Sequence, residues 1–131
     1  MLCVVDTNVV VSGLLNPRGK PGAVLERIPA GRLVPVLTGP IFAEYESVLH
    51  RKRLRIDPVL AAGLLADMEY FGVLLHPAPT TDVVLPDPDD TPFFAAAKYL
   101  RCPLVTGNRR DFPAGREIEI LSPAEFIARF P

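Results

Sequence analysis

Tryptophan and glutamine are absent from this 131-residue chain, and histidine and cysteine occur only twice each. Cys3 and Cys102 each lie in or next to an expected strand, so we interpret them as buried free thiols, which suit a reducing cytoplasm. His50 and His76 are distant from the acidic positions described below, so a zinc site is not expected. Few amide side chains and 15 prolines fit either a heat-adapted source or a GC-rich genome.

The chain also lacks a long apolar run and an excess of charge of either sign. No run approaches the roughly 18 residues of a membrane span, and Asp6 interrupts the first one, which no basic region precedes. We therefore expect neither a membrane segment nor a signal peptide. The net charge is −1, so overall charge does not point to nucleic acid as a partner. With 49% hydrophobic and 22% charged residues, residues 1–131 are predicted to form one globular domain.

Short apolar segments alternate with helical patterns along the chain. The continuous apolar run Leu2–Val5 is typical of a strand buried on both faces of a parallel sheet. Strands alternating with helices imply an α/β fold of βαβ units with right-handed crossovers. Pro35 lies within the second expected strand and favours an edge position or a bulge there, because proline cannot donate to a strand ladder. The expected strands are residues 2–5, 33–37, 73–75, 103–105 and 118–121, and the expected helices are residues 9–15, 21–31, 38–49, 58–71, 91–100 and 124–130.

Acidic residues gather where the expected strands end. Asp6 directly follows the first strand, and Glu44 lies near the start of the helix after the second strand. In open α/β sheets, ligands bind outside the carboxyl ends of the strands, so these side chains are expected to share one crevice. The acids expected at this edge are Asp6, Glu44, Asp87, Asp89, Asp90 and Asp111.

Each of these acids also has a simpler structural interpretation. Asp6 is a favoured N-cap for the helix that follows it. Glu44 lies on the same helix face as Arg51 two turns later, so it could be a solvated residue or the partner of that arginine. Asp90 could be an N-cap as well, although Thr91 could take that role and leave Asp90 free.

The remaining acids lie in loops. Asp87 and Asp89 suit the turn that precedes a helix. Asp111 could form an ion pair with Arg109 or Arg110. No single acid points to a function by itself, but their shared edge of the sheet does.

Converging carboxylates repel one another unless their pKa values rise or a cation lies between them. Hard oxygen ligands suit Mg²⁺ or Mn²⁺, which bind through a few carboxylates and keep waters for a phosphate substrate. Two such metals, about 3.5–4 Å apart, activate water and stabilise the leaving oxygen of a phosphodiester. The acidic edge therefore predicts metal-assisted phosphodiester hydrolysis.

Three segments and one helical acid resemble the PIN-domain family. Val4–Ser12 is similar to the opening of PIN-domain proteins, Asp87–Phe94 to their third acidic motif, and Leu104–Phe112 to their fourth. Glu44 stands where the family has its second acid. The resemblance follows the order of the chain and covers almost all of it.

The resemblance implies a PIN-like α/β/α sandwich with a five-stranded parallel sheet in the order 3-2-1-4-5. It also implies an Mg²⁺- or Mn²⁺-dependent endoribonuclease, with RNA as its substrate. Small single-domain members similar to this chain are often VapC-type toxins, held inactive by a small antitoxin and usually homodimeric. Asp6, Glu44 and Asp90 match the catalytic, metal-binding acids of the family. Asn8 and Thr106 match positions that orient the site.

The sequence departs from the family pattern at one position. The fourth acid of the family often stands at position 108, where this chain has Asn108, and the nearest acid is Asp111. An amide oxygen can ligate Mg²⁺ but brings no charge. We therefore expect one firm metal site, with Asn108 and Asp111 as candidate ligands of a weaker second one.

Local positive charge marks a candidate RNA contact, because phosphates are bound by arginine and lysine. Arg51 shares a helix face with Glu44, so we expect it to orient that carboxylate. The alternative is that this basic run is a solvated helix end, where cations favour the C-terminal dipole. The candidate RNA-binding residues are Lys52, Arg53, Arg109 and Arg110, with Arg51 and Arg55 beside them.

Two rival interpretations belong to other functional classes. A receiver domain also places aspartate at strand ends, but it needs an acidic pair after the first strand and a lysine near the last one. This chain has neither. A degenerate PIN domain that binds RNA or protein without cleavage is the stronger rival.

Overall fold

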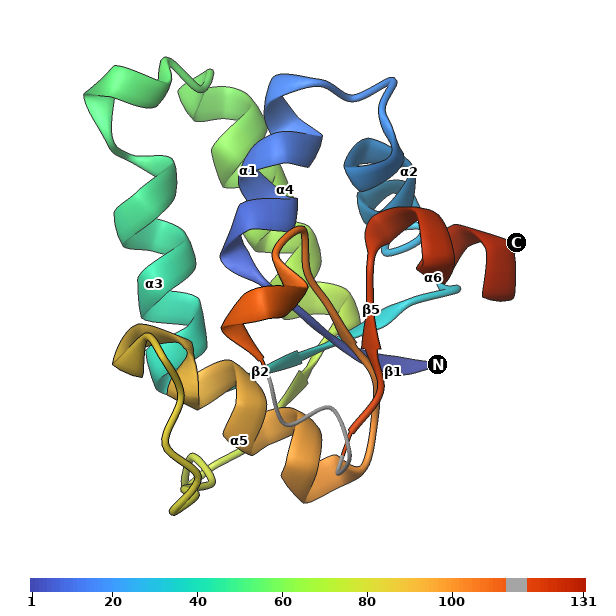
Figure 1. Ribbon diagram of the computed structural model, residues 1–131. Coiled ribbons are helices and arrows are strands. Elements are labelled where there is room, and N and C mark those ends of the chain that lie inside the picture. Colours follow the sequence, from blue (N-terminus) through green and yellow to red (C-terminus); the bar gives the residue numbers. More distant parts are fainter. Residues whose placement is uncertain (113–117) are drawn as a thin grey trace.

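The computed structural model describes residues 1–112 and 118–131 and places a five-stranded parallel sheet between layers of helices, as Figure 1 shows. The strand order is β3-β2-β1-β4-β5, which confirms the expected α/β/α architecture. Because all neighbouring strands are parallel, their carboxyl ends lie at one edge of the sheet. The strands are β1 (Leu2–Val5), β2 (Val34–Leu37), β3 (Val73–Leu74), β4 (Leu104–Val105) and β5 (Ile120–Leu121).

The central strand of the sheet is β1. It pairs with β2 on one side and with β4 on the other. Its residues Cys3, Val4 and Val5 are fully buried, as the continuous apolar run predicted. The acid that follows this strand, Asp6, is therefore anchored at the middle of the carboxyl edge.

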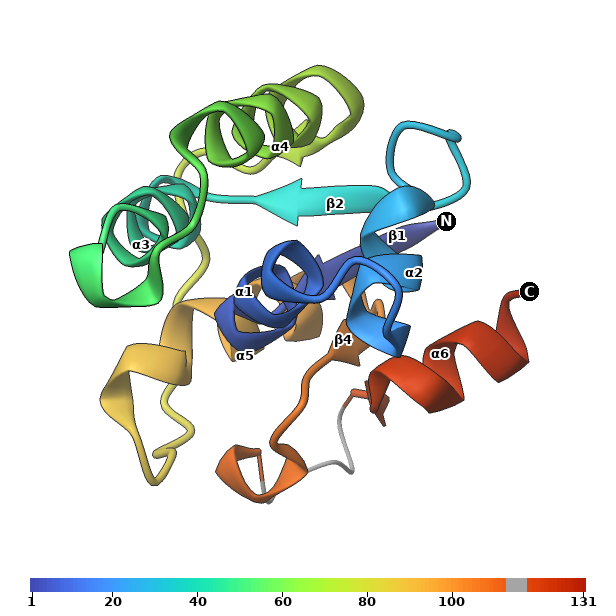
Figure 2. The ribbon, with the colours of Figure 1, turned by 90° about the horizontal axis from the view of Figure 1, so that it is seen from above.

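Helices cover both faces of the sheet. They are α1 (Thr7–Leu15), α2 (Lys20–Glu26), α3 (Gly39–Leu49), α4 (Pro58–Phe71), α5 (Thr91–Leu100) and α6 (Pro123–Arg129). Helix α5 packs against β1, β2 and β4 on the lower face in Figure 1, and α1, α2, α4 and α6 lie on the opposite face. Helix α3 contacts α1, α4 and α5, and α2 lies beside α6, as Figure 2 shows from above. No helix in the described part of the chain combines the length and apolar character needed to cross a membrane.

The helix starts follow the signals in the sequence. The Asp57 carboxylate accepts a hydrogen bond from the Val59 amide at 2.8 Å, at the first turn of α4. Helix α6 begins with a capping box between Ser122 and Glu125. At both helices the capping side chain stands where the helix begins, as the sequence indicated.

The expectation that Pro35 places its strand at an edge or in a bulge is wrong, because β2 lies between β1 and β3. The Val34 amide donates to Met1 of the β1 side, so the nitrogen of Pro35 faces the β3 side. There β3 has not yet begun, since it pairs with β2 only from Val36 onward. The missing N–H of the proline therefore removes no ladder hydrogen bond.

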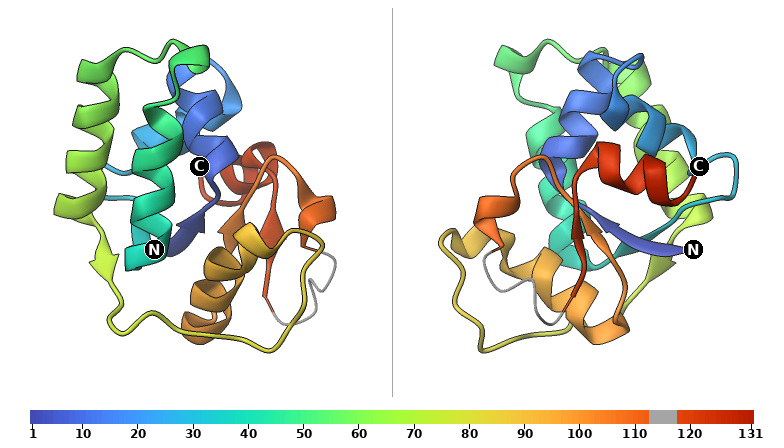
Figure 3. Two further views of the ribbon diagram at one scale, coloured as in Figure 1. Left: turned by 90° about the vertical axis from the view of Figure 1, so that its left-hand side faces the viewer. Right: turned by 45° about the vertical axis from the view of Figure 1, so that its right-hand side comes forward.

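The segment between β3 and α5 carries three of the acids. It leaves β3, passes along the α5 side of the sheet and returns to the carboxyl edge, as Figure 3 shows. There it ends in the 3-10 helix η2 (Pro88–Asp90), which leads directly into α5. Further 3-10 helices, η1 (Lys52–Leu54) and η3 (Arg109–Asp111), follow α3 and β4.

Candidate active site

One cavity at the carboxyl edge of the sheet collects the acidic residues. Its volume is about 390 Å³, and its walls come from the end of β1 and from α1, α3, η1, η2 and η3. All six acids that the sequence predicted for this edge line the cavity: Asp6, Glu44, Asp87, Asp89, Asp90 and Asp111. The parallel sheet thus brings together side chains that are far apart in the sequence.

Asp6 caps a helix and lines the cavity at the same time. One carboxylate oxygen accepts a hydrogen bond from the Thr7 amide at 2.8 Å and caps α1, which begins two residues earlier than expected. The other oxygen accepts from the Thr106 hydroxyl at 2.7 Å. Burial raises the pKa of Asp6 more than these hydrogen bonds lower it, and the charges of Glu44 and Asp111 raise it further.

Asn8 and Thr106 join α1 to the end of β4. Asn8 Oδ1 accepts a hydrogen bond from the Gly107 amide at 2.9 Å, and Asn8 Nδ2 donates to Thr106 Oγ1 at 3.4 Å. Thr106 is fully buried and also accepts from the Asn108 amide at 3.0 Å. Because Thr106 donates to Asp6, this network fixes the direction of the Asp6 carboxylate. The orienting role that the family resemblance implies for Asn8 and Thr106 stays a prediction.

Glu44 is held by Thr7 rather than by Arg51. The Thr7 hydroxyl donates to Glu44 Oε2 and so links the first turn of α1 to α3. Arg51 lines the same cavity, but it forms no ion pair with Glu44 or with any other residue that the structure describes. The expectation that Arg51 orients Glu44 is therefore wrong, because a hydroxyl from the neighbouring helix already holds that carboxylate.

Asp90 carries a carboxylate oxygen that has no partner. Its backbone occupies the N-cap position of α5, but its side chain makes no capping hydrogen bond, and the helix begins at Thr91. Asp90 Oδ2 is buried and finds no hydrogen-bond donor among the described residues. Burial, followed by the charges of Asp6 and the other acids of the cavity, raises the pKa of Asp90 from 3.8 to about 7. A buried oxygen without a partner, among other acids, is a position that a proton or a cation would fill.

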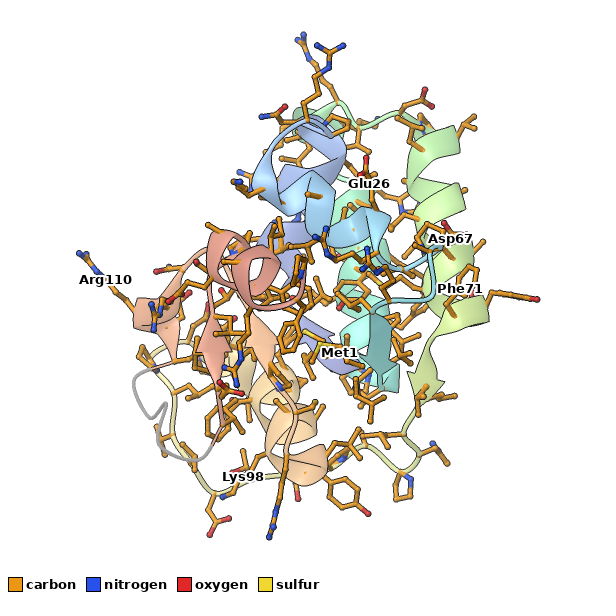
Figure 4. All side chains as sticks on the ribbon, turned by 90° about the vertical axis from the view of Figure 1, so that its right-hand side faces the viewer. Met1, Glu26, Asp67, Phe71, Lys98 and Arg110 are labelled. Carbon is orange, nitrogen blue, oxygen red and sulfur yellow. The ribbon has the colours of Figure 1, made fainter. Side chains whose placement is uncertain are left out.

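Asp111 is held in place by Asn108. Asn108 Nδ2 donates to Asp111 Oδ2 at 3.0 Å, whereas Asn108 itself does not line the cavity. Asp111 does not pair with a neighbouring arginine: Arg109 binds Glu125 at 3.0 Å, and Arg110 extends away from the molecule in Figure 4. In this arrangement Asn108 positions an acid of the cavity without lining the cavity itself.

The loop acids Asp87 and Asp89 fit the turn interpretation. Asp87 Oδ1 accepts a hydrogen bond from the Asp89 amide at 2.9 Å and caps η2. Both side chains are exposed at the rim of the cavity. The turn that they form directs Asp90, the third acid of the segment, into the cavity.

Tyr45, next to the site, was not predicted from the sequence as a contributor to it. Its hydroxyl is fully buried and donates to the Val5 carbonyl oxygen, beyond the last β1–β2 pair at Cys3. Its ring lies 6.0 Å from the ring of Phe93 on α5. Tyr45 therefore joins β1, α3 and α5, the three elements next to the central acids. Helical spacing marks Tyr45 as a core residue, and a buried hydroxyl needs a partner, but the spacing does not say which one.

Tyr45→Phe is expected to lower the free energy of unfolding by about 2 kcal/mol, because the Val5 carbonyl is left buried without its donor. Urea unfolding followed by circular dichroism measures the change. Tyr99→Phe is the matched control, since Tyr99 is 69% exposed on α5. Equal losses in the two variants would contradict the role of the Tyr45 hydroxyl.

The acids fit a hard divalent cation. The partnerless oxygen of Asp90, together with the repulsion that raises its pKa, creates a position for positive charge. Among residues 1–112 and 118–131, no three Asp, Glu, His or Cys side chains stand together as a complete ligand set. Mg²⁺ needs only one or two carboxylates because it keeps several waters, so Asp6 and Asp90 suffice.

Of the basic residues that the sequence analysis named, some line the cavity and others do not. Arg51 and Arg53 line the cavity, whereas Lys52 is exposed on η1 outside its lining. Arg109 and Arg110 belong to η3, and neither lines the cavity. Within the cavity, the positively charged side chains therefore come from η1 and from Arg51, the residue before it.

Comparison with known proteins places the chain in a family. A family model described as PIN domain matches residues 3–110. An uncharacterized protein of Methanocaldococcus jannaschii is 27% identical over 141 aligned positions, which cover 97% of this chain and 90% of that protein. A chain of the VapBC2 complex of Rickettsia felis, solved with a DNA fragment from its promoter, has a TM-score of 0.57 at 13% identity, over 93% of this chain and 98% of that one. This structural likeness shows a shared fold, and because the family model covers most of the sequence, the chain belongs to the PIN-domain family.

Proposed function

We propose that the protein is a metal-dependent endoribonuclease that hydrolyses RNA phosphodiester bonds with Mg²⁺ or Mn²⁺. The buried, partnerless Oδ2 of Asp90, in a cavity lined by carboxylates, is the observation that carries this proposal. Membership of the PIN-domain family supports it, because PIN domains are generally nucleases.

Three acids form the proposed metal site. Asp6 and Asp90 hold the cation, and Glu44 lies at the same site with its carboxylate held by the Thr7 hydroxyl. When bound, the cation supplies a water of lowered pKa and neutralises charge at the phosphate. The Thr106 hydroxyl keeps the Asp6 carboxylate in its direction, and Asp90 gives up its proton when the site fills.

Incubation of the purified protein with a labelled single-stranded RNA tests the proposal. We expect cleavage with Mg²⁺ or Mn²⁺, none after addition of EDTA, and much slower cleavage of DNA with the same sequence. Binding of the RNA without cleavage in either metal would favour the alternative, a degenerate PIN domain that holds RNA or protein without cutting it.

Charge on η1 is expected to contribute to RNA binding, because Arg53 lines the cavity and Lys52 is its neighbour. Replacing both with glutamine should weaken binding about tenfold at low salt and should reduce the slope of log affinity against log salt by about 1.4. Fluorescence anisotropy at several salt concentrations measures both. The same change at exposed Arg18 and Lys20 is the control, and an unchanged slope in the η1 variant would refute the contact.

We also propose that a small antitoxin is the protein partner, because the Rickettsia felis neighbour is a VapBC complex. A second, mainly apolar groove of about 430 Å³ lies between α1, α2 and α4, with Val59 and Leu60 exposed on its wall. Glu26 of α2 and Asp67 of α4, labelled in Figure 4, also line it. The groove therefore suits an apolar segment with basic residues.

Light scattering of the purified chain, alone and with a candidate partner, separates this complex from the homodimer that the family resemblance implies.

A further inference from the structure

The cavity at the carboxyl edge extends beyond its acids. Part of its wall is apolar and consists of Val11 of α1, Val48 of α3 and Leu54 of η1, all partly buried. Ser12 adds an exposed hydroxyl to the lining. Aliphatic side chains cannot ligate a cation, so this wall has no role in the proposed hydrolysis.

Two arginines share the cavity with the apolar wall. Arg51 and Arg53 are exposed, and neither forms an ion pair within the part of the chain that the structure describes. The acids and the arginines of the cavity therefore do not neutralise one another by direct contact. Both guanidinium groups are free to bind an anion that enters from solvent.

We propose that the wall of Val11, Val48 and Leu54 is a subsite for the base of an unpaired nucleotide next to the bond that is cleaved. The inference rests on the proposed nuclease function, because the acids of the same cavity would then hold the reacting phosphate through a cation. A nucleotide carries both a charged group and an apolar surface, and this cavity has side chains that suit each of them. Its phosphate suits the arginines, and the apolar faces of its base suit aliphatic side chains.

The subsite restricts the class of substrate. A base can lie against α1 and α3 only after it has left its stack, and bases of an RNA duplex are paired and stacked. We therefore expect single-stranded or looped RNA to be cleaved in preference to duplex RNA. The contacts of the wall are mainly aliphatic, so selectivity among the four bases should be weak.

A set of RNAs with one abasic residue tests the subsite. The RNAs are single-stranded and otherwise identical, and the abasic residue occupies each position around the cleaved bond in turn. At one position, loss of the base should lower kcat/KM about tenfold, near the low end for a stacked base because the wall is aliphatic rather than aromatic. The same RNA without the abasic residue, annealed to its complement, should be cleaved more slowly than the single strand.

Substitutions in the wall make the test specific. The double substitution Val48→Ser and Leu54→Ser should abolish the tenfold difference between normal and abasic RNA, and Leu54→Ser alone should reduce it if the double variant does not fold. Val84→Ser is the matched control, because Val84 is 90% exposed and lies outside the cavity. The control should keep the full difference.

Nucleotide binding provides a measurement that does not depend on cleavage. In NMR spectra recorded with Mg²⁺, the methyl signals of Val11, Val48 and Leu54 should shift with a nucleoside 5′-monophosphate and not with inorganic phosphate. Equal kcat/KM for all abasic RNAs, or equal shifts with phosphate and nucleotide, would overturn the subsite. RNA that is not cleaved at all would overturn the nuclease proposal instead, and the methyl shifts would then decide on nucleotide binding by themselves.

Discussion

Asp90→Asn is expected to slow RNA cleavage by at least about 100-fold, and Asp6→Asn and Glu44→Gln should have effects of similar size. Replacing a residue that only supports a metal ligand typically costs about 10–100-fold, so removing one of the acids that form the proposed metal site should cost more. Each substitution keeps the size of the side chain and an oxygen that accepts hydrogen bonds. The Thr106 and Thr7 hydroxyls, which donate to Asp6 and Glu44, therefore retain their acceptors.

Although Asp90→Asn should slow cleavage, it should make the metal-free protein more stable. Burial and the charge of Asp6 raise the pKa of Asp90 to about 7, and its Oδ2 has no donor among the described residues. Above that pH the folded protein must carry an unfavourable charge, which asparagine removes. In EDTA at pH 8, Asp90→Asn should therefore melt at a higher temperature than the parent. Mg²⁺ should raise the melting temperature of the parent and have little effect on the variant.

Differential scanning fluorimetry with and without Mg²⁺, run beside the cleavage assay, measures both effects. Asp82→Asn removes the same charge from an exposed position outside the cavity and should change neither the rate nor the melting temperature. If Mg²⁺ stabilises Asp90→Asn as strongly as it stabilises the parent, Asp90 is not a ligand. Normal cleavage by that variant would remove Asp90 from the mechanism.

The backbone of this protein was largely predictable because its local signals agree with one another. The apolar run Leu2–Val5 is typical of a strand buried on both faces, and Asp57 and Ser122 each stand one residue before a proline that opens a helix. The acids could be placed for a related reason. Each follows a strand, precedes a helix or, as Glu44 does, lies in the first turns of a helix at the same edge, and a parallel sheet turns that shared position into proximity.

The contacts between the acids were not predictable, because they depend on distances between elements. In the sequence Arg51 is the natural partner of Glu44, since both lie on one helix face, whereas the structure gives that role to Thr7 of α1. The burial of Asp90 depends on how η2 packs at the edge of the sheet. Pro35 is tolerated in an inner strand because of the residue at which β3 begins. None of these facts is encoded in the periodicity of a single segment.

Mg²⁺ binding is expected to weaken about tenfold for each pH unit below about 7. The pKa of Asp90 is raised to about 7, so at lower pH the cation must displace a proton from this carboxylate. One displaced proton gives a tenfold change in apparent affinity per pH unit. Burial also raises the pKa of Asp6, so Asp6 should make the dependence steeper at still lower pH. Above about pH 7 the affinity should be nearly constant.

The raised pKa of Asp90 also determines how the stability of the metal-free protein depends on pH. A carboxyl group whose pKa is higher in the folded than in the unfolded state binds its proton more tightly when folded. Its favourable contribution to folding is complete below the unfolded pKa and is lost as the pH rises through the folded one. For Asp90 this window runs from 3.8 to about 7. The melting temperature in EDTA should therefore fall across the window, and saturating Mg²⁺ should restore it at pH 8.

Isothermal titration calorimetry at several values from about pH 5.5 to about pH 8 measures the affinity, and the heat in buffers of different ionisation enthalpy counts the protons released. Asp90→Asn should bind Mg²⁺ more weakly than the parent, but its affinity should change little between about pH 6 and about pH 8, because the group that titrates there is gone. A slope that persists in the variant would assign the displaced proton to another residue. A parent whose affinity is independent of pH would mean that Asp90 is already ionised without metal, and its partnerless oxygen would then require a different explanation from an empty place in a cation site.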